Sequence, residues 1–193
     1  MIEPRHLFAA VFGLIVVERI FELFLSARNR KRALARGGMV VKEDPYGLIV
    51  VLHSLFIVAA PLEVFFLPGI PSPLLAWSMT VVAVVAMGLR YWAILTLGNR
   101  WNAQVICVPG LPAVHSGPYR WVRHPNYVAV GLEMFALPLI GGAWRTALVF
   151  GLLNLAVLQR RIKVEEEALS THSDYAHLFA GQPRFLPGGR RPS

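Results

Sequence analysis

Cysteine is almost absent from this 193-residue sequence, in which Cys107 is the one example. An internal disulfide and a cluster of cysteine metal ligands are therefore excluded, and no metal site is predicted. Charged residues are also scarce, at 16% of the chain against about 25% in soluble domains. Hydrophobic residues reach 55%, and the mean hydropathy is +0.53. This composition predicts an integral membrane protein, and the length suits a single domain over residues 1–193.

Motifs of the common soluble enzyme folds are missing as well. The sequence has no G-x-x-x-x-G-K-[ST] phosphate loop, no G-x-G-x-x-G turn, no G-x-S-x-G elbow and no H-E-x-x-H zinc pair. Strand and helix patterns do not alternate, which excludes a soluble Rossmann methyltransferase. Basic residues outnumber acidic ones by 19 to 11. Because they flank apolar segments, as in membrane proteins generally, no nucleic-acid binding is predicted.

Long apolar segments make up most of the chain. We expect about five transmembrane helices, each long enough or nearly long enough to cross about 30 Å of hydrocarbon. The last two are short and are joined by Gly141-Gly142, which predicts a tight helical hairpin. The predicted fold is therefore an all-α integral membrane protein. Its spans are residues 4–25, 46–67, 74–97, 126–140 and 143–159.

Basic residues gather on one side of these spans. A strongly basic loop begins with Arg28-Asn29-Arg30-Lys31-Arg32 after the first span, and Arg123 and Arg160 flank the hairpin. Because Lys and Arg are enriched in cytoplasmic loops, we expect the N-terminus outside and the C-terminus in the cytoplasm. The first span has no small-residue cleavage motif and contains charges, so we expect it to be retained rather than removed as a signal peptide.

Ionisable residues inside the spans are costly in lipid, so they are candidates for function or for mutual pairing. Glu18, Arg19 and Glu22 should face the bundle interior and pair with one another or with later spans. Arg90, near the cytoplasmic end of the third span, either serves the site or extends to the interface. The side chains that could line the route of a substrate are Glu18, Glu22, His53, Glu63 and Glu133.

A polar stretch rich in aromatic residues, glycine and proline, residues 115–127, separates the third and fourth spans. Pro118 is expected to open a short helix that carries Arg123 and stops at His124, because Pro125 follows. Pro125 should open the next helix, whose free N–H groups point back at this stretch. The result is a basic pocket at the membrane surface, suited to a carboxylate or a phosphate. Interfacial anchoring is the alternative for each aromatic or arginine taken singly.

The last span is predicted to continue as a helix through residues 160–169, beyond the membrane. The hairpin then returns Glu165 and Glu166 to the vicinity of the polar stretch. Residues 174–187 are expected to lie over that surface as a cap, and residues 188–193 to fray.

Three motifs follow one another in the C-terminal half. They are His115-x-Gly117-Pro118-Tyr119-x-x-x-Arg123-His124-Pro125-x-Tyr127, Arg161-Ile162-x-x-Glu165-Glu166-x-x-Leu169 and Pro183-Arg184-Phe185-Leu186-Pro187. Their order resembles the isoprenylcysteine carboxyl methyltransferase family. The resemblance covers about residues 98–187, as a core with a helical hairpin and a C-terminal lid, and leaves residues 1–97 as three N-terminal spans. That N-terminal part is similar to a bacterial branch that O-methylates long-chain alkylpyrones or alkylresorcinols, which implies a bacterial inner (plasma) membrane.

The resemblance implies S-adenosyl-L-methionine as the cofactor, bound in a pocket that faces the cytoplasm, and a lipophilic or lipidated substrate that arrives from the bilayer. A carboxylate acceptor would need an orienting cation, Arg123 or Arg90. A phenol or enol would instead need a base, for which His53, Glu133 or His124 could serve. The predicted catalytic residues are Arg123, Glu166, His53 and Arg90. By motif position, the predicted cofactor-binding residues are His115, Gly117, Tyr119, Arg123, His124, Pro125, Tyr127, Glu165 and Glu166.

Three functions are compatible with these features. The first is a membrane O-methyltransferase that uses S-adenosylmethionine and acts on an isoprenylcysteine-type carboxylate or a long-chain polyketide. The second is an N-methyltransferase of phospholipid amines, which an amine substrate would identify. The third is a non-catalytic membrane scaffold, which would bind no cofactor. No oligomeric state is predicted.

Overall fold

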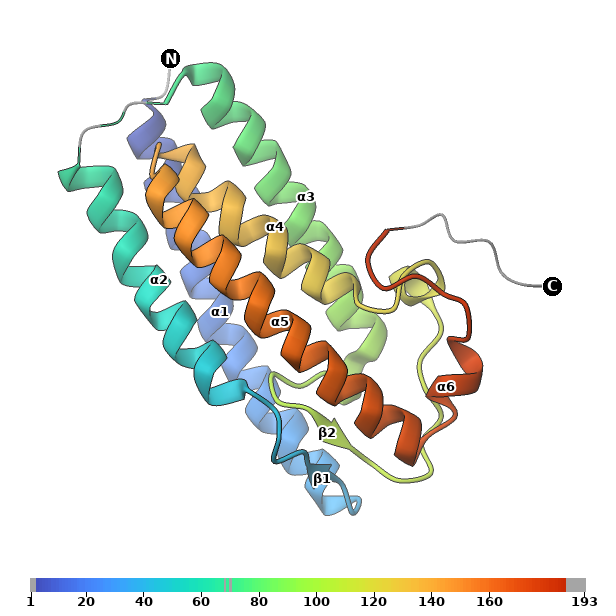
Figure 1. Ribbon diagram of the computed structural model, residues 1–193. Coiled ribbons are helices and arrows are strands. Elements are labelled where there is room, and N and C mark those ends of the chain that lie inside the picture. The colour runs from blue at the N-terminus through green and yellow to red at the C-terminus, as the bar shows by residue number, and fades with distance from the viewer. Residues whose placement is uncertain (1–2, 68, 70, 187–193) are drawn as a thin grey trace.

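The computed structural model describes residues 3–67, 69 and 71–186, and long helices in these residues form an elongated bundle (Figure 1). The long helices are α1 (Pro4–Ala35), α2 (Tyr46–Phe66), α3 (Pro73–Leu97), α4 (Pro125–Ile140) and α5 (Trp144–His172). The short elements are η1 (Gly98–Arg100), η2 (Gly117–Arg120) and α6 (Tyr175–Leu178), with strands β1 (Met39–Val40) and β2 (Ile106–Cys107). The mostly helical architecture agrees with the all-α part of the predicted fold class.

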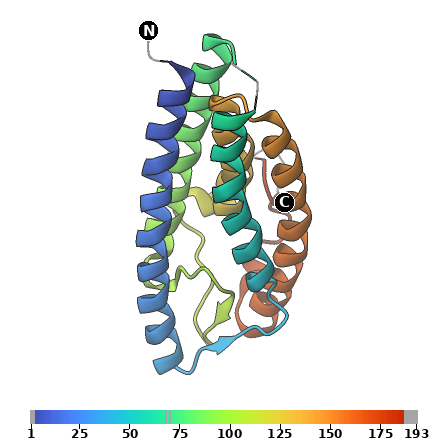
Figure 2. The same ribbon diagram turned by 90° about the vertical axis from the view of Figure 1, so that its left-hand side faces the viewer.

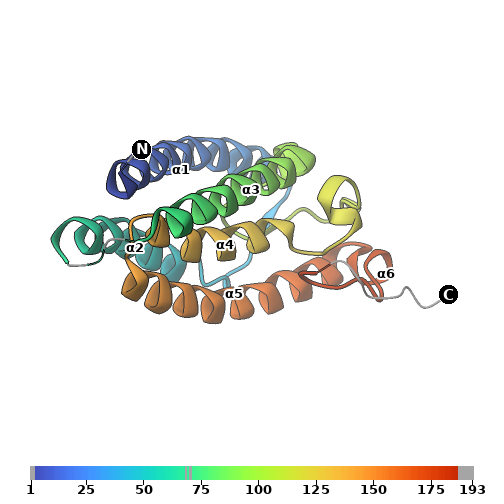
Figure 3. The ribbon, with the colours of Figure 1, turned by 90° about the horizontal axis from the view of Figure 1, so that it is seen from above.

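Helix α4 lies at the centre of the bundle. It packs against α3 on one side and α5 on the other, and the view from above shows it between these two helices (Figure 3). Helix α1 runs alongside the others for the full length of the bundle (Figure 2). Gly151 of α5 lies against the ring of Phe135, where any Cβ atom would collide with that ring. The missing side chain therefore lets α5 approach α4 closely.

Proline sets the starting points of several helices. Pro4, Pro73 and Pro125 each occupy the first turn of a long helix, where the missing N–H removes no intrahelical hydrogen bond. Helix α3 is also capped, because Ser72 Oγ accepts a hydrogen bond from the Leu75 N–H at 3.2 Å. The predicted start of a helix at Pro125 is confirmed, as is the hairpin turn at Gly141-Gly142 between α4 and α5.

Among the described residues, two helices have the length and apolar composition to cross a membrane. They are Tyr46–Phe66, with a mean hydropathy of 2.3, and Pro73–Arg100, with 1.8. Only 28% of each apolar window is buried inside the bundle, so most of these apolar side chains face outward. Helix α4 is apolar but shorter, and α1 and α5 carry charged segments. The five-span topology and its orientation stay predictions.

The largest apolar cluster lies in one half of the bundle, and two smaller apolar clusters lie beside the polar groups of the other half. Phe8 and Phe12 of α1 stack with ring centroids 4.9 Å apart and pack in one cluster with Phe56, Leu137 and Ile140. These residues lie toward the N-terminal end of α1 and the C-terminal end of α4. The opposite half, where α1 ends and α4 begins, contains the polar loop before α4.

The basic run at residues 28–32 is helical, so its prediction as a loop was wrong. Helix α1 continues without a break to Ala35, because Arg, Lys and Ala all favour helix. Asn29, which is fully buried, donates to the carbonyls of Gly98 and Trp101 at 3.2 and 2.8 Å. These bonds hold the basic end of α1 against η1.

The helix predicted from Pro118 to His124 was also wrong beyond Arg120. Only the four-residue η2 forms there, because the N–H groups of Arg123 and His124 donate to the carbonyls of Pro183 and Arg184 at 3.0 and 3.1 Å. Strands β1 and β2 pair antiparallel; they were not predicted, since two-residue strands show no alternation.

Glu63, a predicted lining residue, instead caps α5. Its carboxylate accepts hydrogen bonds from the N–H groups of Arg145 and Thr146 at 3.1 and 2.7 Å, and from Thr146 Oγ1 at 2.7 Å. A carboxylate at a helix N-terminus satisfies free N–H groups and complements the helix dipole. Glu63 therefore ties α2 to α5.

Replacement of Glu63 by alanine should lower the stability of the bundle, because it exposes the unpaired N–H groups of α5. A lost cap costs about 1–2 kcal/mol, measurable as a lower midpoint of thermal unfolding in detergent. Leu62→Ala is the matched control, since Leu62 is 51% exposed on the same helix. Equal midpoints for the two variants would contradict the capping role.

Candidate active site

The backbone of the C-terminal strap, which comprises residues 182–184, holds the polar loop before α4. Arg123 Nε donates to the carbonyl of Gln182 at 2.7 Å, in addition to the two backbone hydrogen bonds at Arg123 and His124. The Gln182 amide donates to the carbonyl of Tyr119 at 2.8 Å and accepts from His115 Nε2 at 2.9 Å. The strap therefore fixes loop residues that are far away in sequence, as the predicted C-terminal cap required.

Glu166 is a carboxylate surrounded by cations. It accepts hydrogen bonds from Arg123 Nη1 at 3.3 Å, His124 Nε2 at 3.0 Å and Arg184 Nη2 at 2.5 Å. Burial by itself would raise the pKa of Glu166, but the hydrogen bonds and charges of His124 and Arg184 outweigh burial and lower the pKa to about 2. Glu166 is thus ionised near neutral pH and connects α5 to both the loop and the strap.

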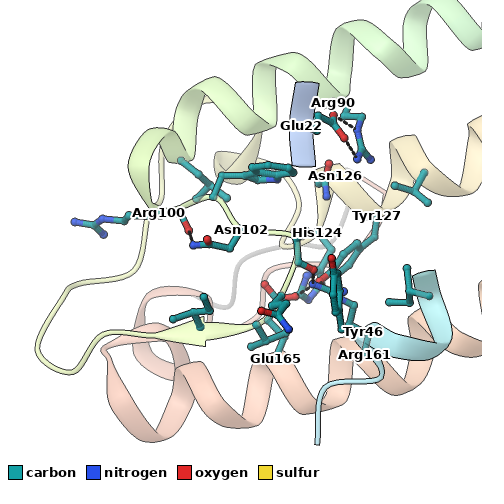
Figure 4. Close-up of a pocket in the computed structure, with 18 of the residues that line it drawn as sticks. Glu22, Tyr46, Arg90, Arg100, Asn102, His124, Asn126, Tyr127, Arg161 and Glu165 are labelled. Carbon is teal, nitrogen blue, oxygen red and sulfur yellow. Dashed lines mark hydrogen bonds and ion pairs between the residues drawn. The ribbon is translucent and has the colours of Figure 1, made fainter. Parts of the chain in front are cut away.

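Tyr127, in the first turn of α4, connects α4 to α5. Its hydroxyl donates to Glu165 Oε2 and accepts from Arg161 Nε, the latter at 2.8 Å, and the close-up shows the three side chains together (Figure 4). Arg161 also pairs with Asp44 at 3.6 Å, and both side chains are less than a tenth exposed. The segment between β1 and α2 thereby supports the groups around Tyr127.

Four charged side chains meet inside the bundle and form what we term the buried ionic cluster. Arg90 Nε and Nη2 donate to the two oxygens of Glu22, each at 2.6 Å. Arg19 bridges Glu22 and Glu133 at 2.6 and 2.7 Å. The pairing predicted for Arg19 and Glu22 is confirmed, whereas the pairing predicted for Glu18 was wrong, since its carboxylate makes no hydrogen bond to the described residues. With two positive and two negative charges, the cluster is neutral and joins α1, α3 and α4.

A cavity of about 440 Å³ joins the polar loop, the buried ionic cluster and the apolar core (Figure 4). Its size falls within the range of sites for small molecules. The polar end is lined by Tyr119, Arg123, His124, Tyr127, Arg161 and Glu165, and the inner end by Phe12, Phe56, Val130, Met134 and Leu137. The cavity is therefore amphiphilic along its length.

His53 of α2 lines this cavity, and one of its ring nitrogens makes a hydrogen bond within its own helix. Its Nδ1 lies 2.9 Å from the carbonyl oxygen of Ile49. Because a carbonyl can only accept, Nδ1 must carry the proton, and in the neutral ring Nε2 keeps a free lone pair. The predicted role of His53 as a base stays a prediction.

The cavity brings together most of the residues proposed from the sequence. From the predicted set, its lining includes His53, Arg90, Tyr119, Arg123, His124, Tyr127 and Glu165. Glu22 and Glu133 line it as well, whereas Glu18 and Glu63 do not.

Four predicted cofactor residues stand behind the lining. His115 binds the strap, Glu166 holds Arg123 and His124 from outside the cavity, and Pro125 starts α4. Gly117 has a φ of +52° and packs so closely on α3 that a Cβ atom would collide with Thr96. These residues shape the site instead of forming its walls, and their binding roles stay predictions.

Two further lining residues were not among the predicted site residues. Asn126 fills the unspecified position between Pro125 and Tyr127 in the motif, and Arg161 begins the second motif but was assigned no role. The helix register of α4 and α5, once known, places both at the cavity.

A helical bundle with an apolar exterior, and a cavity that runs from a cation-rich end to an apolar one, defines a membrane-type protein with a site for amphiphilic ligands. The model of the isoprenylcysteine carboxyl methyltransferase (ICMT) family matches residues 78–171. The uncharacterized protein YpbQ of Bacillus subtilis is 32% identical over 169 residues, which cover 86% of this chain and 99% of that protein. This chain belongs to the ICMT family, whose members are methyltransferases.

Two other relatives span most of this chain. An uncharacterized protein of Haemophilus influenzae is 28% identical over 174 residues, or 87% of this chain and 94% of its own length. A protein-S-isoprenylcysteine O-methyltransferase of Tribolium castaneum is 25% identical over 175 residues, or 85% of this chain and 59% of its own length. The family predicted from the motifs is thus confirmed.

Acid should weaken the contacts of Glu166 in a defined pH range. The unfolded carboxyl has an ordinary pKa near 4.5, whereas the folded pKa is about 2. A depressed folded pKa contributes stability that is present above about pH 4.5 and is lost as the pH falls toward 2. We expect Glu166→Gln to lower the midpoint of thermal unfolding similarly at pH 7 and pH 5, and less at pH 3.

The exposed neighbour Glu167 provides the matched control. Glu167→Gln should change the midpoint little at any of these pH values. A deficit of Glu166→Gln that is the same at pH 7 and pH 3 would contradict the role given to its charge.

Proposed function

We propose that this chain is a membrane-embedded O-methyltransferase that uses S-adenosylmethionine and methylates a lipophilic acceptor arriving from the bilayer. The observation that carries the proposal is a continuous cavity that joins Arg123 and His124 to the apolar core. A polar, charged cofactor and an apolar acceptor can meet only where such environments adjoin. Membership of a methyltransferase family supports the reaction type.

The polar end of the cavity fits the amino-acid part of the cofactor. Arg123, His124 and the N-terminus of α4 offer donors and positive charge to a carboxylate. Glu165, which lines the cavity, offers an acceptor to an ammonium group, whereas Glu166 is occupied by Arg123, His124 and Arg184. We therefore assign the ammonium contact to Glu165 and a positioning role to Glu166.

S-adenosylmethionine supplies an electrophilic methyl group, so the protein has to align the acceptor and exclude water. Leu169 and Phe179 line the same end of the cavity and suit a flat, apolar base. The strap covers the loop that carries Arg123 and His124. These contacts support a cofactor enclosed between the loop, α5 and the C-terminal segment.

The inner polar groups favour a hydroxyl acceptor over a carboxylate. Arg90 is bound by both oxygens of Glu22, so it has little free charge for a second carboxylate. The free lone pair of His53 Nε2 suits the removal of a proton from a phenol or enol. In this proposal the acceptor oxygen gives its proton to His53 as it takes the methyl group. A long-chain pyrone or resorcinol meets these requirements.

We further propose five membrane spans, with the cavity's polar end at the cytoplasmic face of a bacterial inner membrane. Arg30 and Lys31 of α1 are exposed and follow Asn29, which contacts Gly98 and Trp101 before the polar loop. Arg160 of α5 is also exposed and precedes Arg161, which contacts Tyr127. This arrangement agrees with the enrichment of Lys and Arg on the cytoplasmic side.

Titration calorimetry with S-adenosylhomocysteine tests the cofactor site. Detergent-purified wild type should bind with a micromolar dissociation constant. Arg123→Ala and Glu165→Gln should each weaken binding by about tenfold or more, because each removes a charge-assisted hydrogen bond. Glu166→Ala should abolish methylation by misplacing Arg123 and His124, and Glu167→Gln serves as the control. Folded wild type that binds no S-adenosylhomocysteine would overturn the proposal in favour of a scaffold.

Methyl-labelled cofactor then identifies the acceptor class. A resorcinol with a long alkyl chain should be labelled, and a prenylated cysteine carboxylate should be labelled less. Label in phosphatidylethanolamine would instead indicate an N-methyltransferase.

His53→Gln should lower the turnover of the resorcinol by about a hundredfold, the usual contribution of a general base. Its affinity for S-adenosylhomocysteine should stay the same, since His53 lies on α2, away from the polar loop. Ser54→Ala, at a neighbouring lining position, is the control. Turnover by His53→Gln within a few fold of wild type would remove His53 from the mechanism.

A further inference from the structure

Five buried polar atoms of cavity-lining residues have no hydrogen-bond partner among the residues that the structure describes, and three of them belong to α3 and α4. These three are Oδ1 of Asn126, Oε1 of Glu133 and Nη1 of Arg90. Each atom is buried and each residue lines the cavity; Glu133 and Arg90 are only 5% and 7% exposed. An unsatisfied buried polar group costs about 1–3 kcal/mol. A ligand in the cavity that supplies the missing partners would recover this free energy.

These residues lie between the two ends of the cavity. Asn126 and Glu133 are seven residues apart on α4, which places them on one face of the helix and roughly 10 Å apart along its axis. Asn126 follows the polar loop directly, and Figure 4 shows it between Tyr127 and the Glu22–Arg90 pair. The head of an amphiphilic acceptor must occupy this level if its tail lies in the apolar end.

Charge decides which group can bind there. The buried ionic cluster is already neutral, with Arg19 and Arg90 balanced by Glu22 and Glu133. A carboxylate would meet the free oxygens of Glu133 and Asn126, and an ammonium would meet the guanidinium of Arg90. A hydroxyl group can donate a hydrogen bond to one of the free oxygens and accept one from Arg90 Nη1. It therefore pairs with both kinds of atom without adding charge.

We propose that Asn126, Glu133 and Arg90 form a polar recess that binds a second, uncharged hydroxyl group of the acceptor, distinct from the oxygen that is methylated. The inference rests on the proposed function and narrows its substrate to amphiphiles whose head carries at least two oxygen functions. Glu133 and Arg90 also hold the bundle together through their ion pairs. Asn126 has no such partner at its Oδ1 and is therefore the specificity-determining residue.

A matched pair of ligands tests the recess: a resorcinol and a phenol with the same long alkyl chain, titrated calorimetrically into detergent-purified protein. Wild type should bind the resorcinol about tenfold more tightly, since one buried hydrogen bond of about 1.4 kcal/mol is worth that factor. Asn126→Leu should reduce the ratio to less than about threefold. Equal binding by wild type, or an unchanged ratio in Asn126→Leu, would overturn the proposal.

Asn154→Leu is the matched control, because Asn154 is 1% exposed, has unpartnered amide atoms and lies outside the cavity lining. It should keep the wild-type preference. Asn126→Ala, which adds no bulk, replaces Asn126→Leu if the leucine variant does not fold.

Titration of the same samples with S-adenosylhomocysteine separates the two proposals. All folded variants should bind it as wild type does. If wild type does not bind S-adenosylhomocysteine, the methyltransferase function is refuted. If wild type binds S-adenosylhomocysteine but does not prefer the resorcinol to the phenol, only the proposed recess is refuted.

Discussion

The ion pair between Arg90 and Glu22 is the contact on which the rest of the bundle depends. Burying a charged group costs several kcal/mol per ion, and removal of one partner from a buried pair costs about 3–5 kcal/mol. The two-pronged contact of Arg90 with Glu22, extended by Arg19 to Glu133, therefore permits one register of α1, α3 and α4. If any of these helices shifted by one turn along its axis, a charged side chain would lose its partner inside the apolar interior.

A second set of ionic contacts fixes the other end of the cavity. Glu166 holds Arg123, His124 and Arg184, while Tyr127 and Arg161 position Glu165. The polar end and the inner cluster are thus each organised by protein contacts before any ligand is present. Such preorganisation lowers the cost of binding, and it keeps the cavity open between two rigid layers.

Much of the fold could be predicted because its signals are local. Pro125 predicts the start of α4, and Gly141-Gly142 predicts its end. The cost of a charge inside the membrane predicts that Arg19 and Glu22 pair. The rest depends on contacts distant in sequence. The carbonyls of the strap prevent the expected helix at Arg123, and nothing near Glu63 reveals that it caps α5. Asn126 occupies a position that no motif specifies, so only the register of α4 exposes its place in the cavity.

The buried ionic cluster cannot form until residues far along the chain have been synthesised. Glu22 precedes its partner Arg90 by 68 residues, and Arg19 precedes Glu133 by 114. At ribosomal rates of about 5–20 residues per second, α1 waits roughly three to twenty seconds for these partners. During that interval its charges need water, lipid headgroups or the insertion machinery as surroundings. Helix α1 can therefore settle in its final environment only after most of the chain has emerged.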